Sequence, residues 1–355
     1  MKTITSAARY LAVFAALALI CATGLAQSSE RAAGGGTDTG GGTIYYVGPW
    51  DGATHNTAVM RAMNSDATNN RQLGFGPQGN PSIALHGGHR WFLTSRQTPG
   101  VYNPDGTERY ELFAIRDDDD NMNNNPVTRV QLTYDVDLQL QFSSLNWVLG
   151  DQTISFEARR WSGGVVVEGG IYTASPVFDA DGNITGLAAQ ATTPAISFPL
   201  VEVTPGDLWA DLNNHSWAPT GNKVIYTRVG DRDLTVADLL GGAHQRIYTG
   251  SARNPQWSPD GAKIAFSSGG SIFTIKPNGT QRKAIVSAFQ NWTFYWGAYW
   301  SPGGTYIAFT GQKIEGSNAN LDVFRATATG TGRTNLTNQP YPFNEFIAFG
   351  HGGWR

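Results

Sequence analysis

The stretch NPQWSPDGAKIAF, from Asn254 to Phe266, contains two short apolar segments separated by turn residues. The residues from Ser258 to Gly261 favour a tight turn, because Pro presets φ and Gly accepts a left-handed backbone. The apolar residues from Ile264 onward then begin a returning strand. The stretch therefore predicts a β-hairpin whose first strand ends at Trp257.

The same hairpin frame returns along the chain, as a Trp followed seven residues later by an aliphatic residue. Three further copies have identical spacing: Trp147…Ile154, Trp217…Val224 and Trp300…Ile307. Two weaker copies keep the Gly-rich turn: ALHGG at 84–88 and FGHGG at 349–353. The chain is therefore expected to contain six hairpin starts.

A second pair of apolar segments follows each hairpin start. After Trp257 these segments are Ile272–Ile275 and Ala284–Val286, joined by the turn residues PNG. After Trp147 the corresponding turn is DADGN, residues 179–183. Each unit is therefore expected to hold four strands.

The units repeat with the period of propeller blades, since Trp217, Trp257, Trp300 and Phe349 lie 40, 43 and 49 residues apart. The frame WSPDG…IAF…NG…LT resembles the TolB-type β-propeller repeat of secreted and periplasmic bacterial proteins, clearly over 215–337 and loosely over 81–190. The resemblance implies an all-β fold, a six-bladed propeller of four-stranded antiparallel blades over residues 43–355. Because this repeat occurs in scaffolds, peptidase gating domains and polysaccharide lyases alike, it indicates architecture and no particular partner.

The two ends of the propeller region complement each other. Thr43–Val47 has no hairpin start ahead of it, whereas Phe346–Gly353 has a hairpin start without its return strand. The N-terminus is therefore predicted to supply three strands of a closing blade, and the C-terminus its innermost strand. Closure of the ring leaves no exposed sheet edge at the seam.

The N-terminal residues 1–26 have the pattern of a secretory signal peptide. Lys2 and Arg9 precede an apolar run at 11–20, and Gly24-Leu-Ala26 suits cleavage before Gln27. The run is too short to span a membrane, and Ile20 disfavours a lipoprotein cut before Cys21, the only cysteine. Residues 27–42 have the Gly/Ser/Thr-rich composition that predicts a flexible linker. The sequence predicts a secreted or periplasmic protein without disulfides.

The composition gives no electrostatic reason for a nucleic-acid or anionic membrane partner. The 355 residues have a formal net charge of -3, and only 15% are charged. Gly and aromatic residues are abundant, as in turn-rich all-β proteins. We expect a monomer without a cofactor that binds a protein segment or a glycan.

The connections of an up-and-down propeller alternate between two faces. The turns after each hairpin Trp and those between third and fourth strands define one face, the turn face. The connections between second and third strands and those between blades define the other, the loop face. Its predicted loops are long: 49–56, 97–109, 157–170, 190–215, 287–299 and 338–345.

Aromatic rings are concentrated in the loops of the loop face, where propellers commonly bind ligands. Flat rings with a polar edge suit sugars or extended peptides. The aromatic residues of these loops also include Phe294, Tyr299 and Phe343, and packing between blades is the alternative for Trp296 and Tyr299. The predicted ligand-binding residues are Trp50, His55, Tyr102, Trp161, Trp209, His215, Trp292, Tyr295, Trp296 and Tyr341.

The histidines do not indicate a metal centre, because only His55 and His215 fall on the loop face; His86, His89, His244 and His351 fall on the turn face. A metal-free lyase site for an acidic glycan is the alternative to a binding platform. Its base and its uronate-neutralising group would come from His215, Arg253 and Tyr299, with Arg159 or Arg160. A buried hydrogen-bonding role is the other interpretation of His215.

Two acidic segments are candidates for a calcium site. The segment DADGN at 179–183 lacks the Glu that a calcium loop requires and favours a hairpin turn. Asp117, Asp119 and Asn121 form a denser group of oxygens and are weak calcium candidates. No GxSxG elbow, HExxH or P-loop is present, so the sequence does not indicate a serine hydrolase, a zinc protease or a nucleotidase.

Overall fold

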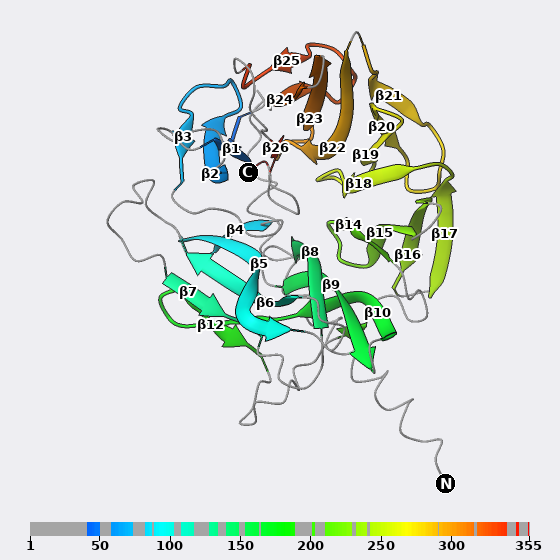
Figure 1. Ribbon diagram of the computed structural model, residues 1–355. Coiled ribbons are helices and arrows are strands. Elements are labelled where there is room, and N and C mark those ends of the chain that lie inside the picture. The colour runs from blue at the N-terminus through cyan, green and yellow to red at the C-terminus, as the bar shows by residue number, and fades with distance from the viewer. Residues whose placement is uncertain are drawn as a thin grey trace.

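The computed structural model of the protein describes strands and turns only. The described residues are 41–49, 58–73, 82–86, 89–102, 108–116, 128–133, 140–148, 153–162, 165–188, 201–202, 210–228, 232–239, 242–289, 291–315, 318–338, 346–347 and 354. No helix that could cross a membrane occurs within these ranges. Six four-stranded antiparallel sheets form a ring (Figure 1), which confirms the predicted six-bladed propeller.

The strands of the first three blades are given from the innermost to the outermost strand. Blade 1 is β26 (Phe346–Ile347), β1 (Thr43–Pro49), β2 (Ala58–Asn64) and β3 (Arg71–Gln72). Blade 2 is β4 (Ser82–His86), β5 (His89–Tyr102), β6 (Glu108–Arg116) and β7 (Thr128–Gln131). Blade 3 is β8 (Leu140–Val148), β9 (Thr153–Ser162), β10 (Val165–Ala174) and β13 (Val201–Glu202).

The other three blades follow the chain without interruption. Blade 4 is β14 (Ala210–Trp217), β15 (Lys223–Arg228), β16 (Leu234–Asp238) and β17 (Ala243–Tyr248). Blade 5 is β18 (Ala252–Trp257), β19 (Ile264–Ser268), β20 (Ser271–Ile275) and β21 (Lys283–Val286). Blade 6 is β22 (Trp292–Trp300), β23 (Tyr306–Glu315), β24 (Asn318–Thr327) and β25 (Thr334–Asn335).

The seven-residue spacing in the sequence is a cross-strand pair in the structure. Trp257 lies opposite Ile264, and the Trp147, Trp217 and Trp300 pairs have the same register. In the turn between Trp257 and Ile264, the Ser258 N–H donates to the Lys263 carbonyl at 2.8 Å. Gly261 closes this turn with φ 70°. The residues that favour a turn in the sequence therefore form one.

The ring closes as predicted, but with a different C-terminal residue in the position of the hairpin Trp. In β26, Phe346 pairs with Val47 of β1. Trp354, and not the predicted Phe349, then pairs with Ile44, the counterpart of Ile307. Phe349 lies outside the described residues. The residue in the hairpin Trp position of blade 1 is therefore a Trp, as in blades 3 to 6.

Blade 3 differs from its predicted form. The DADGN turn at 179–183 does not join the third and fourth strands of this blade. It connects β11 (Pro176–Phe178) to β12 (Ile184–Leu187), a separate two-stranded hairpin. The fourth strand is β13, which the sequence had placed within a loop. Ile184 and Leu187 of the extra hairpin pack with Trp91 of blade 2, so the insertion joins two blades.

Neighbouring blades are tied together close to each hairpin Trp. The Trp257 N–H donates to Ser216 Oγ of blade 4 at 3.3 Å, and the Trp300 indole N–H donates to the Gln256 carbonyl of blade 5 at 3.2 Å. On the turn face, a Cβ added to Gly330 of blade 6 would lie 2.8 Å from the Ile285 carbonyl oxygen of blade 5. The blades are thus in close contact along the turn face.

Candidate functional site

The hairpins of second and third strands on the loop face are long in three blades. In blade 2 the pairing of β5 with β4 ends at Leu93, but β5 continues to Tyr102, which pairs with Glu108. The β9–β10 and β23–β24 hairpins are long too, but β8 and β22 pair with them as far as Arg160 and Lys313. In blade 5 the corresponding hairpin is short and ends at Ser268. Two of the predicted loops, 97–109 and 157–170, are therefore largely strand.

The predicted ligand-binding residues on these hairpins are only partly described. Tyr102 ends β5 with 61% of its surface exposed, the largest value among the described large hydrophobic residues. Trp161 belongs to β9 and pairs with Val166. The other predicted site residues of the connecting loops lie outside the described residues: Trp50, His55, Trp209, Tyr341, Asp117, Asp119 and Asn121.

The aromatic segment predicted as a loop at 287–299 is mostly the innermost strand β22. Phe294 and Tyr299 are buried, at 0% and 4% exposure. Tyr299 packs with Ile44 and Trp354 at the seam, which is the inter-blade role left open for it. Trp292 is half-buried, with its ring edge-on to Phe324 at 4.9 Å. Tyr295 and Trp296 lie in the same strand.

A β-bulge recurs in the innermost strands, just before the hairpin Trp. In β18, Arg253 pairs with Ser267 and Gln256 with Ala265, so Asn254 and Pro255 together face one residue, Phe266. The same two-against-one register occurs in β8 and β22. Bulges change the direction of the side chains that precede them. Ser143, Arg253 and Trp296 occupy this preceding position in three blades.

His215 lies in a buried polar group between blades 3 and 4. It is 3% exposed, and its Nε2 lies 3.0 Å from Asn146 Nδ2 and 2.9 Å from Ser155 Oγ. The Trp217 indole N–H donates to the same Ser155 hydroxyl at 2.9 Å. This is the structural role that the sequence left open for His215. Its role toward a ligand stays a prediction.

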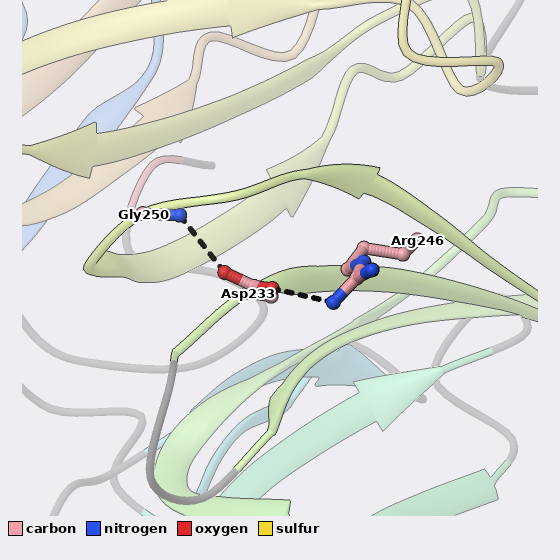
Figure 2. A network of polar contacts seen from close by, with 3 residues as sticks. All are labelled: Asp233, Arg246 and Gly250. Carbon is pink, nitrogen blue, oxygen red and sulfur yellow. Dashed lines mark hydrogen bonds and ion pairs between the residues drawn. The ribbon is translucent and has the colours of Figure 1, made fainter.

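Buried carboxylates anchor the connections of the loop face. Asp233, just before β16, is 5% exposed; it accepts the Gly250 N–H at 2.8 Å and pairs with Arg246 at 3.1 Å (Figure 2). Asp322, within β24, accepts hydrogen bonds from Thr337 Oγ1 at 2.9 Å and Asn335 Nδ2 at 2.8 Å. Each carboxylate ties a third strand, or the residue just before it, to the segment that follows the fourth strand.

Glu111, before Leu112 of β6, makes the same kind of contact with Thr133 Oγ1, at 2.6 Å. These three acids are not among the residues that the sequence predicts for the site. The available signal was an acidic residue immediately before the apolar run of a third strand, as in Glu111-Leu112, Asp233-Leu234 and Asp322-Val323.

The segments that contain Arg232 and Arg253 meet where blades 4 and 5 join. The Arg232 carbonyl accepts the N–H of Ala252, the residue before Arg253, at 3.0 Å. Both residues are half-buried. Arg232 has a left-handed backbone, with φ 54°. The β18 bulge, formed by Asn254 and Pro255, begins directly after Arg253. Non-glycine residues in this conformation are strained and often occur at functional sites.

The acidic DADGN segment is a hairpin turn, as the sequence favoured. The Asp179 N–H donates to the Asn183 carbonyl at 2.9 Å, and Gly182 has φ 79°. Hydrogen bonds from the Asn183 side chain and backbone lower the pKa of Asp179 below its usual value. Within the described part of the chain, no three His, Cys, Asp or Glu side chains gather as around a metal ion.

Comparison with known proteins gives a similarity of fold. No protein-family model matches the chain, and no curated protein sequence matches it. The crystal structure of TolB from Acinetobacter baumannii is similar with a TM-score of 0.56 and 15% identity over 85% of this chain; the match spans 65% of that TolB chain.

Two other solved structures are similar at comparable levels. A protein from Agrobacterium tumefaciens assigned as TolB has a TM-score of 0.50 and 14% identity, covering 83% of this chain and 88% of its own. Kuenenia stuttgartiensis hydrazine synthase has a TM-score of 0.51 and 9% identity, covering 86% and 46%. At such identities the likeness concerns architecture alone. The predicted resemblance is confirmed at that level: this chain has the six-bladed β-propeller fold that is also found in TolB proteins.

Proposed function

We propose that this protein is an extracytoplasmic, non-catalytic platform that binds a protein segment or a glycan on the loop face of its propeller. One contrast between the two faces supports the proposal. The turn face consists of short turns in contact with the next blade, as at Gly330 and Ile285. The loop face carries three extended hairpins, one of which ends in the exposed Tyr102. Irregular projections on a rigid scaffold are where binding residues usually lie.

The anchoring carboxylates also support a binding role. Asp233 and Asp322 accept hydrogen bonds from Gly250 and Thr337, which lie in connections between blades on the loop face. These hydrogen bonds fix the backbone of the connections, and with it the positions of their side chains. A fixed geometry reduces the conformational entropy lost when a ligand binds. A scaffold that only had to be stable would not require projections on one face alone.

The alternative, a lyase for acidic polysaccharide, receives less support. Two of its three proposed groups, His215 and Tyr299, are only 3% and 4% exposed. A base has to come within hydrogen-bonding distance of the proton that it removes. The two groups also lie in different blade interfaces, since Tyr299 packs at the seam and His215 against blade 3.

Binding and lyase activity are separated by two measurements on the purified protein. Peptide and glycan arrays are probed with the wild type, with Tyr102→Ala on the loop face and with Thr220→Ala on the turn face. We expect binding that Tyr102→Ala weakens and Thr220→Ala leaves unchanged. Uronate polymers are then followed for the absorbance of an unsaturated product, which we expect to stay at baseline. An increase in this absorbance that is lost in an Arg253 variant would reject the binding platform in favour of the lyase.

The proposal includes export, with residues 1–26 removed, residues 27–42 as a linker and a single monomeric propeller over 43–355. Sequencing the N-terminus of the protein recovered from the medium or the periplasm tests this part. We expect the mature chain to begin at Gln27. A chain that retains Met1 in the cytoplasm would contradict it.

A further inference from the structure

Positive and negative charges are divided between opposite sides of the propeller. Residues 252–335, which form blades 5 and 6, contain eight Lys and Arg residues against three Asp and Glu. Residues 82–202, which include blades 2 and 3, contain seven against 15. The two pairs of blades lie across the ring from each other (Figure 1). The net charge of -3 therefore conceals one basic side, to which an anionic partner would be attracted.

Two arginines of the basic side, Arg282 and Arg333, have no acidic partner. Both are exposed, and within the described part of the chain their side chains form no hydrogen bond or ion pair; their guanidinium groups contact aromatic rings instead. Of the described acids of these blades, Asp322 accepts the Thr337 hydroxyl at 2.9 Å, and Asp260 lies in the turn after the innermost strand. The charges of the two arginines are therefore available to a ligand.

Arg333 is held in place by an aromatic ring. Its guanidinium carbon lies 3.6 Å from the centroid of the Phe289 ring, so it stands over the face of the ring, and Phe289 in turn stacks on Phe294 at 5.9 Å. A guanidinium on a ring face keeps its N–H donors in its own plane, where a ligand can accept them. Burial lowers the pKa of Arg333 from its usual value, as expected for a cation that loses water without gaining an anion. Arg333 is thus a positioned donor whose lost hydration an anionic ligand would replace.

Arg282 has the same place in blade 5 that Arg333 has in blade 6. Each lies three residues after a glycine with left-handed φ, Gly279 at 83° and Gly330 at 91°, and each directly precedes the outermost strand of its blade. The N–H of each glycine donates to the carbonyl three residues earlier, so the two turns have the same form. The Arg282 guanidinium lies 5.4 Å from the ring centroid of Tyr248, in blade 4. The blade repeat therefore places an arginine beside an aromatic ring at the same corner of two adjacent blades.

Lys283 connects these two corners. It follows Arg282 in the chain, and its Nζ donates to the Thr329 carbonyl of blade 6 at 3.0 Å. Thr329 belongs to the turn that leads to Arg333, and Gly330 of the same turn packs directly against β21. Three cations therefore follow one another from blade 5 to blade 6 along the outer wall, the surface formed by β21, β25 and the turns that precede them.

We propose that Arg282, Lys283 and Arg333 form a second binding site, on the outer wall of blades 5 and 6, for an acidic polysaccharide. This site goes beyond the function proposed for the loop face and does not depend on it. Each guanidinium presents a planar fork of N–H donors that matches the carboxylate of a uronate residue. A polymer carries such carboxylates at regular intervals, so one chain can bind both arginines and the ammonium that connects them.

A polysaccharide is favoured over a protein or a membrane because the described part of the outer wall offers no exposed apolar anchor. The exposed large hydrophobic residues among the described ones are Tyr102 and Val177, which belong to blade 2 and to the inserted hairpin of blade 3. Protein interfaces depend on apolar and aromatic anchors, and binding to a membrane surface on apolar side chains that enter the lipid. An acidic polysaccharide is hydrophilic throughout and can be bound by charge-assisted hydrogen bonds.

Fluorescence polarisation of fluorescein-labelled oligogalacturonate tests the site. The wild type should bind this probe, and the affinity should fall as the salt concentration rises, because salt screens exposed charges. Arg282→Gln and Arg333→Gln should each weaken binding by about tenfold, since a charge-assisted hydrogen bond is lost. Arg333→Lys should give an intermediate affinity, because Lys keeps the charge without the fork.

The matched control is Lys313→Gln. Lys313 belongs to β23 of blade 6 but lies at the loop-face end of this strand, opposite Trp292, so the variant removes one positive charge from the same blade on another surface. Its affinity for oligogalacturonate should equal that of the wild type, and so should that of Tyr102→Ala. Thermal unfolding of each variant confirms that the propeller is intact.

Four results would overturn the inference: no wild-type binding of oligogalacturonate up to millimolar concentration, unchanged affinity in the Arg282→Gln/Arg333→Gln double variant, an equal loss in Lys313→Gln, or tighter arginine-dependent binding of labelled oligoglutamate or of anionic phospholipid vesicles. The platform function fails separately. Oligogalacturonate binding that Tyr102→Ala loses and the double variant keeps would retain the platform and reject the outer-wall site. Array binding that Tyr102→Ala leaves unchanged, with oligogalacturonate binding that the double variant loses, would do the reverse.

Discussion

Trp354 pairs with Ile44 across the seam, and its indole N–H donates to the Gly41 carbonyl at 3.0 Å. Trp354 therefore adds one backbone bridge, to Ile44, and one side-chain hydrogen bond, to Gly41, to the pairing of β26 with β1. Trp354 is 5% exposed and packs with Tyr299 of blade 6. The seam thus joins the last blade, the first blade and the segment ahead of β1.

Removal of this side chain should destabilise the whole propeller. Trp354→Ala should lower the free energy of unfolding by about 3–5 kcal/mol, because a buried Trp leaves a cavity and an unpaired Gly41 carbonyl. Urea denaturation followed by Trp fluorescence measures the change. Tyr102→Ala, at an exposed position, should alter stability by only about 0.5 kcal/mol. Equal stability of Trp354→Ala and the wild type would mean that the seam is closed by other contacts.

Two glycines of one turn should respond differently to the same substitution. An alanine Cβ at Gly330 would lie 2.8 Å from the Ile285 carbonyl oxygen, whereas the space at Gly332 is open. Both have left-handed φ, 91° and 62°. Gly332→Ala should therefore cost about 1 kcal/mol from backbone strain. Gly330→Ala should cost about 1–3 kcal/mol more, from overpacking. Chemical denaturation of the pair measures the difference, and similar losses would argue against close blade contact at this turn.

The buried carboxylate of Asp233 should control the order of the connection that it anchors. Asp233→Asn should cost about 1–3 kcal/mol, because the Gly250 N–H loses a charged acceptor and Arg246 loses its partner. Hydrogen exchange should become faster at the Gly250 amide and remain slow in β20. Lys223→Gln, which breaks the half-exposed pair with Asp238 at 3.5 Å, is the control and should change stability by less than about 1 kcal/mol. Unchanged exchange at Gly250 would contradict the anchoring role.

The turn carboxylate of Asp260 should make stability depend on pH. Burial acts to raise its pKa, but hydrogen bonds from the Ser258 hydroxyl and the Ala262 N–H outweigh burial and lower the pKa below 3.8. The folded pKa is thus below the unfolded one. The carboxylate therefore stabilises the fold above the ordinary value of 3.8, and this contribution is lost as the pH falls through the folded pKa.

The stability difference between wild type and Asp260→Ala should therefore shrink when the pH is lowered from about 6 to about 3. Asn278 is the matched control, because its Oδ1 accepts the Thr280 N–H in a similar turn without titrating. The difference between wild type and Asn278→Ala should stay constant. Urea denaturation at each pH measures both. A constant difference for Asp260→Ala would show that its hydrogen bonds do not favour the ionised form.

The sequence by itself determined the blades, because a tight turn and the pairing of its strands are local. The eight residues from Trp257 to Ile264 define a hairpin wherever they occur, and six such starts with complementary ends determine a closed ring. The prediction for residues 179–183 was wrong, because the sequence of a turn between two apolar segments is the same in a blade and in an inserted hairpin. The sequence also predicted Phe349 in the hairpin Trp position, which Trp354 occupies, because the Gly-rich segment after Phe349 has the composition of a turn.

Only the tertiary structure decided which residues can reach a ligand. Phe294 and Tyr299 are buried because they pack with residues of neighbouring blades. The local sequence cannot indicate whether a distant segment covers a side chain. The anchoring of Gly250 by Asp233 and the hydrogen bond between Arg232 and Ala252 likewise join segments that are apart in the sequence. Such contacts depend on the relative placement of sheets, which the spacing of turns cannot specify.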